Sequence, residues 1–179
     1  ATHEAGHAVC ALRCEHATPI ERISIQGDSA GALGFVRYQD PAHRYVVTRG
    51  QLLDDLCILM GGREAELLLL DDLSIGSSGD LQRATSIARA LVEEFGMGGD
   101  GVGVCRFQSD HGEPSRRIDL SPTQLEALDR SVRELLEQAR QRAAQILRDN
   151  RALVETLRDL LLEHKVIAAN ALSKLEPQR

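Results

Sequence analysis

The sequence predicts a mainly α-helical protein of the α+β class, with a small β-hairpin or sheet near the N-terminus and long C-terminal helices. Three observations lead to this prediction. Apolar residues recur at helical spacing over most of the chain, helix-start signals precede several of these segments, and period-two alternation is confined to one region near the front. The length of 179 residues corresponds to one domain or to two small ones.

Helix and strand signals follow one another at the N-terminal end. The segment from His3 to Cys14 is rich in Ala and has no helix breaker before Pro19, which predicts a helix. The segment from Ile20 to Ile25 alternates apolar and polar residues and predicts a strand. A turn over 27–31 leads to a second predicted strand, Ala32 to Val36, so we expect the two strands to form a hairpin.

Two helices are predicted in the middle of the chain. Thr48 and Gln51 form a capping box that starts the first of them. The pair Gly61-Gly62 is expected to interrupt this helix, as a kink or a close helix crossing, because glycine costs about 1 kcal/mol relative to Ala in a helix interior. The next helix is expected to open at 77–80 and to end near Phe95.

The clearest helix-start signal lies near the C-terminal end. Ser121 as N-cap, Pro122 at the first helical position and Gln124 at the third predict a long helix that ends near Asn150. At 1.5 Å per residue this helix is roughly 40 Å long. A second amphipathic helix, from about Ala152 to His164, is expected to pack back on it with Leu153, Leu157, Leu160 and Leu161 inward.

Composition and charge exclude several functional classes. A formal net charge of −6 and a pI near 5.5 argue against a nucleic-acid-binding surface, which needs clustered Lys and Arg. No apolar run approaches the roughly 18 residues of a membrane span, and the sequence shows no secretory signal. No Walker-type phosphate-binding loop occurs. We therefore expect a soluble chain without a nucleotide-driven motor of its own.

The four cysteines show no C-x-x-C spacing, so neither a disulfide framework nor a thiol-based metal motif is predicted. We expect them to be reduced, intracellular thiols that pack as small apolar groups. They are Cys10, Cys14, Cys57 and Cys105.

The first residues carry the chemistry, as the motif His3-Glu4-Ala5-Gly6-His7, or H-E-x-x-H. Residues four apart on a helix are separated by about 40° around the axis and 6 Å along it, so His3 and His7 can bind one zinc ion. Glu4 lies about 100° from His3 around the axis, where it reaches a water on the metal without ligating the ion. This pattern is typical of a metallopeptidase in which the glutamate is the general base.

A catalytic zinc needs a third protein ligand and one open position. Cys10 and Cys14 are excluded, because the helix from the first histidine to Cys14 spans about 16 Å. Spacing alone does not choose among the remaining candidates. Asp80 has an alternative, structural role, since the helix dipole favours an acidic residue in the first turn of a helix. The candidates are Glu64, Glu66, Asp80, His16, His43 and His111.

Taken in order, these and further motifs resemble the peptidase domain of FtsH, the membrane-bound ATP-dependent zinc protease of the AAA protease family. The resemblance covers nearly the whole chain and is specific because the motifs occur in the expected order. They are His3-Glu4-Ala5-Gly6-His7, Gly31-Ala32-Leu33-Gly34, Gly61-Gly62-Arg63-Glu64-Ala65-Glu66, Ser74 to Thr85, Glu94-Phe95-Gly96-Met97, Leu128 to Val132 and Ile146 to Arg151.

The resemblance implies roles for individual residues. It implies that His3, His7 and Asp80 ligate zinc and that Glu4 is the catalytic base. It also implies that an edge strand holds an extended substrate by strand addition. The residues of that strand are Ala32, Leu33, Gly34, Phe35 and Val36.

The resemblance further implies an endopeptidase that hydrolyses unfolded or ATPase-fed proteins. Residues 1–179 are then a single zinc metallopeptidase domain, with a catalytic part over 1–118 and a C-terminal helical part over 119–179. In the family, the ATPase domain belongs to the same polypeptide, the peptidase domains form a hexamer, and the protein acts at the cytoplasmic face of the membrane. The chain starts two residues before the first implied ligand, so we expect it to be cut from a longer protein, and we expect this part to contact neither membrane nor nucleic acid.

Two alternatives remain open at this stage. Family members usually carry Asn before the ligand Asp, whereas this chain has Gly79, and the segment 67–73 is unusually rich in Leu. A catalytically weak or inactive FtsH-like domain that serves as an oligomeric assembly scaffold is one alternative, although a scaffold does not need Glu4. The other is a zinc peptidase of another clan, with a downstream Glu as third ligand.

Overall fold

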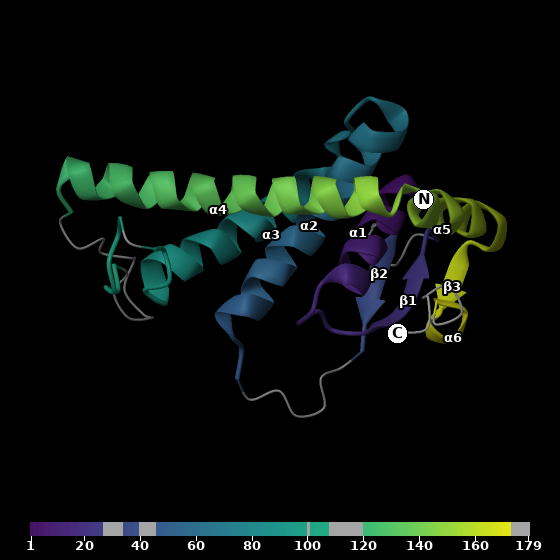
Figure 1. The fold of residues 1–179 in the computed structure, drawn as a ribbon, viewed down its shortest axis with the longest axis horizontal. Coiled ribbons are helices and arrows are strands. Elements are labelled where there is room, and N and C mark those ends of the chain that lie inside the picture. The colour runs from purple at the N-terminus through teal and green to yellow at the C-terminus, as the bar shows by residue number, and fades with distance from the viewer. Residues whose placement is uncertain (27–33, 40–45, 100, 108–119, 173–179) are drawn as a thin grey trace.

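The computed structural model describes residues 1–26, 34–39, 46–99, 101–107 and 120–172. Helices dominate, and a small sheet lies beside the first of them, which confirms the predicted fold class (Figure 1). The elements are, in chain order, α1 Thr2–Arg13, β1 Ile20–Ser24, β2 Phe35–Tyr38, α2 Arg49–Leu70, the 3-10 turn η1 Ile75–Ser77, α3 Ser78–Arg89, the π-helical turn η2 Ala90–Glu94, α4 Pro122–Asp149, α5 Arg151–His164, β3 Val166–Ala168 and α6 Ala169–Leu172.

The sheet has three antiparallel strands in the order β2-β1-β3, so β2 lies at an edge. The β1–β2 pair confirms the predicted hairpin, but the boundaries of its second strand were wrong. Gly34 precedes β2, which continues to Tyr38, while Ala32 and Leu33 lie outside the described residues, as does the turn over 27–31. Strand β3 was not predicted, and its residue Ile167 pairs with Ile23 at the buried face.

Helices α1 and α2 cross in backbone contact. A Cβ atom added at Gly6 would overlap the carbonyl of Gly61, and one added at Gly61 would lie 2.7 Å from the carbonyl oxygen of Gly6. The predicted close helix crossing at Gly61-Gly62 is therefore confirmed, whereas the expected interruption was wrong, since α2 continues through both residues. The predicted N-cap is present, because Thr48 Oγ1 accepts a hydrogen bond from the Gln51 amide at 3.2 Å.

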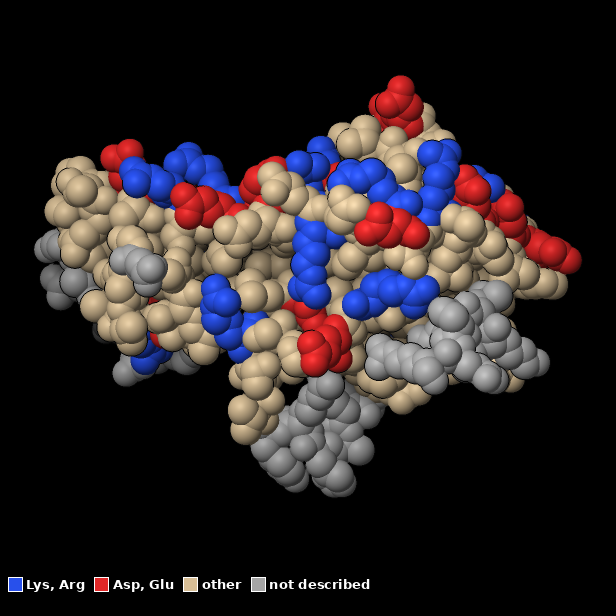
Figure 2. Space-filling model, viewed as in Figure 1, with Lys and Arg blue, Asp and Glu red and all other residues tan. Residues whose placement is uncertain are grey.

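The long helix α4 lies across α2, and α5 continues beyond the end of α4 and packs against α1 (Figure 1). The prediction that α5 packs back on α4 was therefore wrong. Helix α4 starts with the predicted capping box, in which Ser121 and Gln124 exchange side-chain-to-backbone hydrogen bonds. The exposed side of α4 carries interspersed acidic and basic residues, such as the Arg130–Glu126 pair (Figure 2). The opposite side bonds to α2, because Arg142 binds the buried carboxylate of Asp54 at 2.5 Å.

The inward face of α5 agrees with the prediction at Leu157 and Leu161 but not at Leu153 and Leu160. Val154, Leu157 and Leu161 are fully buried, whereas Leu153 and Leu160 are half-buried. Leucines of an amphipathic helix were all assigned inward, although leucine also occurs at the border of the buried face.

Three of the four cysteines pack inside, and all are free thiols. Cys10, Cys14 and Cys57 lie between α1 and α2, where contact with Cys10 and burial raise the pKa of Cys57 to about 12. The expectation of apolar packing was wrong for Cys105, which is exposed in the loop after η2. No helix in the described part of the chain is long and apolar enough to cross a membrane.

Candidate metal centre

Two histidines of α1 and one aspartate of α3 place their side-chain ends together. The Nε2 atoms of His3 and His7 lie 3.0 Å apart, and Oδ2 of Asp80 lies 3.0 Å from the first and 3.2 Å from the second. Within the described residues, this is the one group of three or more His, Cys, Asp or Glu side chains with ligand atoms close enough to share an ion.

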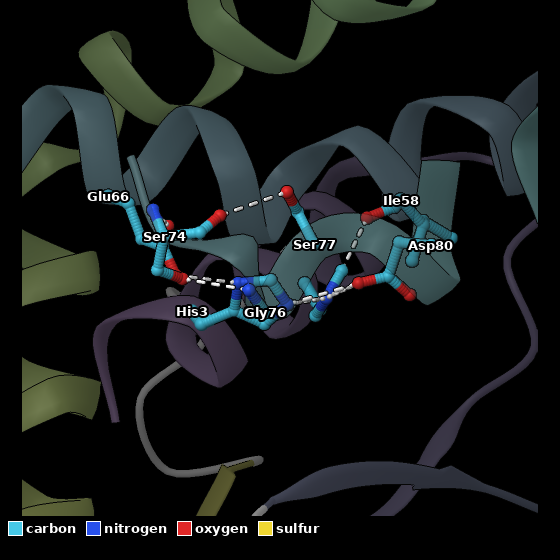
Figure 3. A network of polar contacts seen from close by, with 8 residues as sticks. His3, Ile58, Glu66, Ser74, Gly76, Ser77 and Asp80 are labelled. Atoms are coloured by element: carbon cyan, nitrogen blue, oxygen red, sulfur yellow. Dashed lines mark hydrogen bonds and ion pairs between the residues drawn. The ribbon is translucent and has the colours of Figure 1, made fainter. Parts of the chain in front are cut away.

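Local structure explains how the three side chains meet. The spacing of four residues places both imidazoles on one face of α1, at its first two turns. The turn η1 reverses the chain after α2 and starts α3, so that Asp80 falls in the first turn of α3. An acidic residue is favoured there by the helix dipole, and its side chain points back toward the histidines (Figure 3).

Hydrogen bonds at the other ring nitrogens set the orientation of both imidazoles. His7 Nδ1 lies 2.7 Å from the carbonyl oxygen of Ile58, and His3 Nδ1 lies 3.0 Å from Oε1 of Glu66 (Figure 3). A carbonyl and a carboxylate accept only, so each Nδ1 donates its proton and a neutral ring presents an unprotonated Nε2. Two nitrogen lone pairs and a carboxylate oxygen then converge at about 3 Å.

This arrangement fits a zinc ion. Bonds of about 2.0–2.1 Å at a tetrahedral angle separate neighbouring ligand atoms by roughly 3.3 Å, close to the three distances observed. Two nitrogens and one oxygen are ligands that zinc accepts, and three protein ligands leave the fourth position of a catalytic site open. Without a cation, the three acceptors repel one another unless a proton lies between them.

The ionisation of the cluster reflects the same geometry. Burial opposes the charged form of His3, but the hydrogen bond to Asp80 and the nearby carboxylates of Glu4 and Glu66 raise its pKa above the usual value. Burial likewise disfavours ionised Asp80, yet the two histidines hold the pKa of that carboxyl well below its usual range. The site therefore favours positive charge between the three side chains.

Glu66 links the group formed by His3, His7 and Asp80 to the turn before α3. Besides His3, its carboxylate accepts the Ser74 amide at 2.9 Å and the Ser74 hydroxyl at 3.0 Å (Figure 3). These bonds outweigh the effect of burial and lower the pKa of Glu66, so the side chain is an ionised acceptor. A carboxylate that accepts the Nδ1 proton of a metal-ligating histidine fixes the orientation of its ring and raises its basicity.

Replacing Glu66 with Gln is expected to weaken zinc binding about 10- to 100-fold. The neutral amide removes the negative charge behind His3, and its NH₂ group faces donors at His3 or Ser74. Competition with a zinc-binding chromophore measures the affinity, and Glu126→Gln on the exposed face of α4 is the matched control. Equal affinities of Glu66→Gln and the wild type would contradict this role for Glu66.

Glu4 lies beside the cluster without belonging to it. Its side chain packs against Gly34, because a Cβ atom added there would lie 2.8 Å from Glu4 Oε1. Burial raises the pKa of Glu4, although the histidines at both of its flanks lower it. A carboxylate with a raised pKa is a stronger base than an exposed glutamate, which suits it for proton transfer.

A groove of about 1430 Å³ opens over these side chains and is lined by residues of α1, α2, α3 and β2. Glu4, His7 and Asp80 all face it. Each of the four residues of the edge strand β2 also lines it, as does Gly34. The groove therefore brings the candidate metal site and β2, the edge strand of the sheet in the described part of the chain, into one open space.

The remaining predicted ligand candidates lie elsewhere. Buried Glu64 faces α4, where it pairs with Arg140 at 3.2 Å and with Arg63. His16 is exposed near Gly50 at the start of α2, and Cys10 and Cys14 face the α1–α2 interface. His43 and His111 lie outside the described residues.

Sequence reasoning gave no functional role to Gly62, which the structure places against the cluster. A Cβ atom added there would lie 2.5 Å from Nε2 of His3 and 2.6 Å from Nε2 of His7. The absence of a side chain at Gly62 lets both imidazoles approach the backbone of α2 closely. The glycine pair inside a helix was the available signal, but spacing does not show which element each glycine meets.

The chain is similar to known peptidases over almost its full length. The model of peptidase family M41 matches residues 1–175. The ATP-dependent zinc metalloprotease FtsH of Syntrophobacter fumaroxidans is 34% identical over 97% of this chain and 28% of its own length. Proteins of the same name from Ralstonia pickettii and Cutibacterium acnes are both 36% identical, over 93% and 98% of this chain and 24% of their own lengths. The chain thus spans about a quarter of the length of these relatives.

Proposed function

The chain belongs to peptidase family M41, and on that basis we propose that it is the zinc-dependent proteolytic part of a larger ATP-dependent endopeptidase. His3, His7 and Asp80 are the proposed zinc ligands, and Glu4 is the proposed general base. The proposed substrates are unfolded polypeptides, because an open groove beside a free strand edge accommodates extended chain and not a folded domain.

One observation carries the proposal. In neutral imidazoles, the bonds from His3 and His7 to Glu66 and Ile58 direct both Nε2 lone pairs toward a carboxylate oxygen at 3.0–3.2 Å. Such a convergence of acceptors is stabilised by a bound cation.

The catalytic steps follow from the residues that line the groove. A zinc ion held by the three ligands supplies Lewis acidity, which lowers the pKa of water and polarises a peptide carbonyl. Glu4 takes the proton of the attacking water and transfers it to the leaving amine. Its packing against Gly34 holds the carboxylate between the metal cluster and the edge strand, where the scissile bond is expected to lie.

The edge strand β2 is the proposed substrate-binding element. A polypeptide that adds to its free edge receives main-chain hydrogen bonds that do not depend on sequence. Among the predicted strand residues, Gly34, Phe35 and Val36 line the groove. The proposed role of Ala32 and Leu33 concerns residues outside the described part of the chain.

We propose that residues 1–179 act as one peptidase domain, in which 119–179 support the catalytic part over 1–118. The ion pair between Arg142 and buried Asp54 supports this arrangement, since it ties α4 to the helix behind the cluster. The relatives are named ATP-dependent, which supports a proposed partnership with an ATPase domain of the same polypeptide. Assembly into a hexamer and action at a membrane surface are proposals that rest on the family resemblance alone.

The scaffold alternative has no observation of its own. Gly79 is followed by an Asp80 that reaches both histidines, and the space around Gly79 is open, so the missing Asn side chain does not displace the carboxylate. A scaffold does not need a half-buried Glu4 with a raised pKa.

Metal removal and restoration test the proposal. The purified chain is expected to bind one zinc ion and to cleave casein slowly. Dialysis against a chelator should abolish both, and one equivalent of zinc should restore both. A zinc-loaded protein that cleaves neither casein nor short flexible peptides would overturn the proposed function.

A further inference from the structure

Two arginines share one aromatic ring on the strand pair that borders the groove. The guanidinium carbon of Arg22 lies 5.5 Å from the centroid of the Phe35 ring, and that of Arg37 lies 5.7 Å from it. Arg22 and Arg37 are paired across β1 and β2, and Phe35 lies two residues from Arg37, so all three side chains lie on the same face of the sheet. Phe35 and Arg37 also line the groove.

These two cations lack a carboxylate partner within the described residues. Neither forms an ion pair with a described Asp or Glu within 4.0 Å, and the Nε–H of Arg22 is buried without an acceptor. Paired arginines directly across two strands repel each other, and the shared ring offsets only part of that repulsion. Within the described residues, two guanidinium groups therefore lie around one ring without a carboxylate partner, and one of them, that of Arg37, lines the groove.

We propose that Arg22, Phe35 and Arg37 form a subsite of the substrate groove that binds a peptide carboxylate. This proposal rests on the proposed function, because it assumes that a substrate strand adds to β2. Residues directly opposite each other on neighbouring strands place their Cβ atoms about 5 Å apart on the same face, so the side chain opposite Arg37 meets its guanidinium group.

The position of that side chain follows from the strand spacing. Glu4 packs against Gly34, so the substrate residue opposite Gly34 lies near the scissile bond. Arg37 is three residues further along the strand, or roughly 10 Å. An Asp or Glu about three residues from the scissile bond is therefore the expected ligand. The carboxylate of a free C-terminus at the same distance offers the same chemistry.

Cleavage of matched peptides tests the subsite. The probes are fluorogenic peptides with blocked ends, each with Glu at one position within four residues of the scissile bond, together with their Gln counterparts. A further pair has a free or an amidated C-terminus at the same distance. The wild type is expected to cleave the best Glu peptide with a kcat/KM about 5-fold above its Gln counterpart, mainly through KM, in the range of an exposed ion pair.

Charge-altering variants of exposed Arg37 give the decisive comparison. Arg37→Gln should remove the Glu preference, and Arg37→Glu should reverse it toward a peptide with Lys at that position. Arg130→Gln, outside the groove, is the matched control and should retain the wild-type ratio. Preference for the free C-terminus over the internal Glu would assign the subsite to that carboxylate.

Two failures can be distinguished. Zinc-dependent cleavage of Glu and Gln peptides with equal kcat/KM would overturn the subsite while leaving the proposed function intact. Absence of cleavage of every peptide by the zinc-loaded protein would overturn the proposed function itself. A Glu preference that persists in both Arg37 variants would also overturn the subsite.

Discussion

Replacing Glu4 with Gln is expected to slow peptide hydrolysis by about 10²- to 10⁴-fold, the usual contribution of a general base, while zinc remains bound. The carboxylate lies outside the group of ligand atoms, so its charge is not needed to hold the ion. Gln has the same shape but accepts no proton at neutral pH. Cleavage of a fluorogenic peptide measures the rate, and zinc content is determined on the same samples.

Glu15→Gln is the matched control for this substitution, because Glu15 is exposed just beyond the C-terminal end of α1. It should leave both rate and zinc content unchanged. Undiminished hydrolysis by Glu4→Gln would contradict its role as base. Loss of zinc together with activity would instead assign Glu4 to the metal cluster.

Local signals accounted for most of the helices. Ser121, Pro122 and Gln124 act within one helical turn, and the structure contains the capping box that they predict. The H-E-x-x-H motif is equally local, since one turn of α1 places His3 beside His7 whatever the rest of the chain does. Such features depend only on residues close together in the sequence, so they can be predicted directly from it.

The parts that depend on distant contacts could not be predicted from local patterns. Asp80 bonds to His3 over a sequence separation of 77 residues, and Glu66 bonds to His3 over a separation of 63 residues. Spacing therefore left both acids among the candidate ligands. Only the family resemblance selected Asp80. Strand β3 has three residues, too few for a period-two pattern, and its strand assignment depends on pairing with β1.

The glycine pair shows the same limit within a single helix. Propensity alone predicts that two glycines weaken a helix interior, and that reasoning led to an expected interruption of α2. The structure gives each glycine a separate contact, because Gly61 meets the backbone of α1 at Gly6 whereas Gly62 meets the rings of His3 and His7. Packing against α1 outweighs helix propensity at both positions.

Replacing Gly62 with Ala is therefore expected to weaken zinc binding on the order of 100-fold, the upper end for substitutions behind metal ligands. The new methyl group would lie 2.5–2.6 Å from the Nε2 atoms of both histidines, and a retreat of α2 would give up its close backbone packing on α1 at Gly6 and Gly61. The imidazoles must therefore turn away from Asp80. Competition titration with a zinc-binding chromophore measures the affinity, with Asp80→Ala as the reference for a cluster that lacks one ligand.

Stability separates this effect from misfolding. Ala is favoured over Gly in a helix interior by about 1 kcal/mol, so the metal-free Gly62→Ala variant should retain its helical circular dichroism and melt near the wild-type temperature. Gly79→Ala is the matched control, since it places the same methyl group next to the proposed ligand Asp80 but in open space. It should bind zinc like the wild type. If Gly62→Ala also binds zinc like the wild type, the histidines do not need the space that the glycine leaves. The role predicted for Gly62 in the metal centre is then wrong.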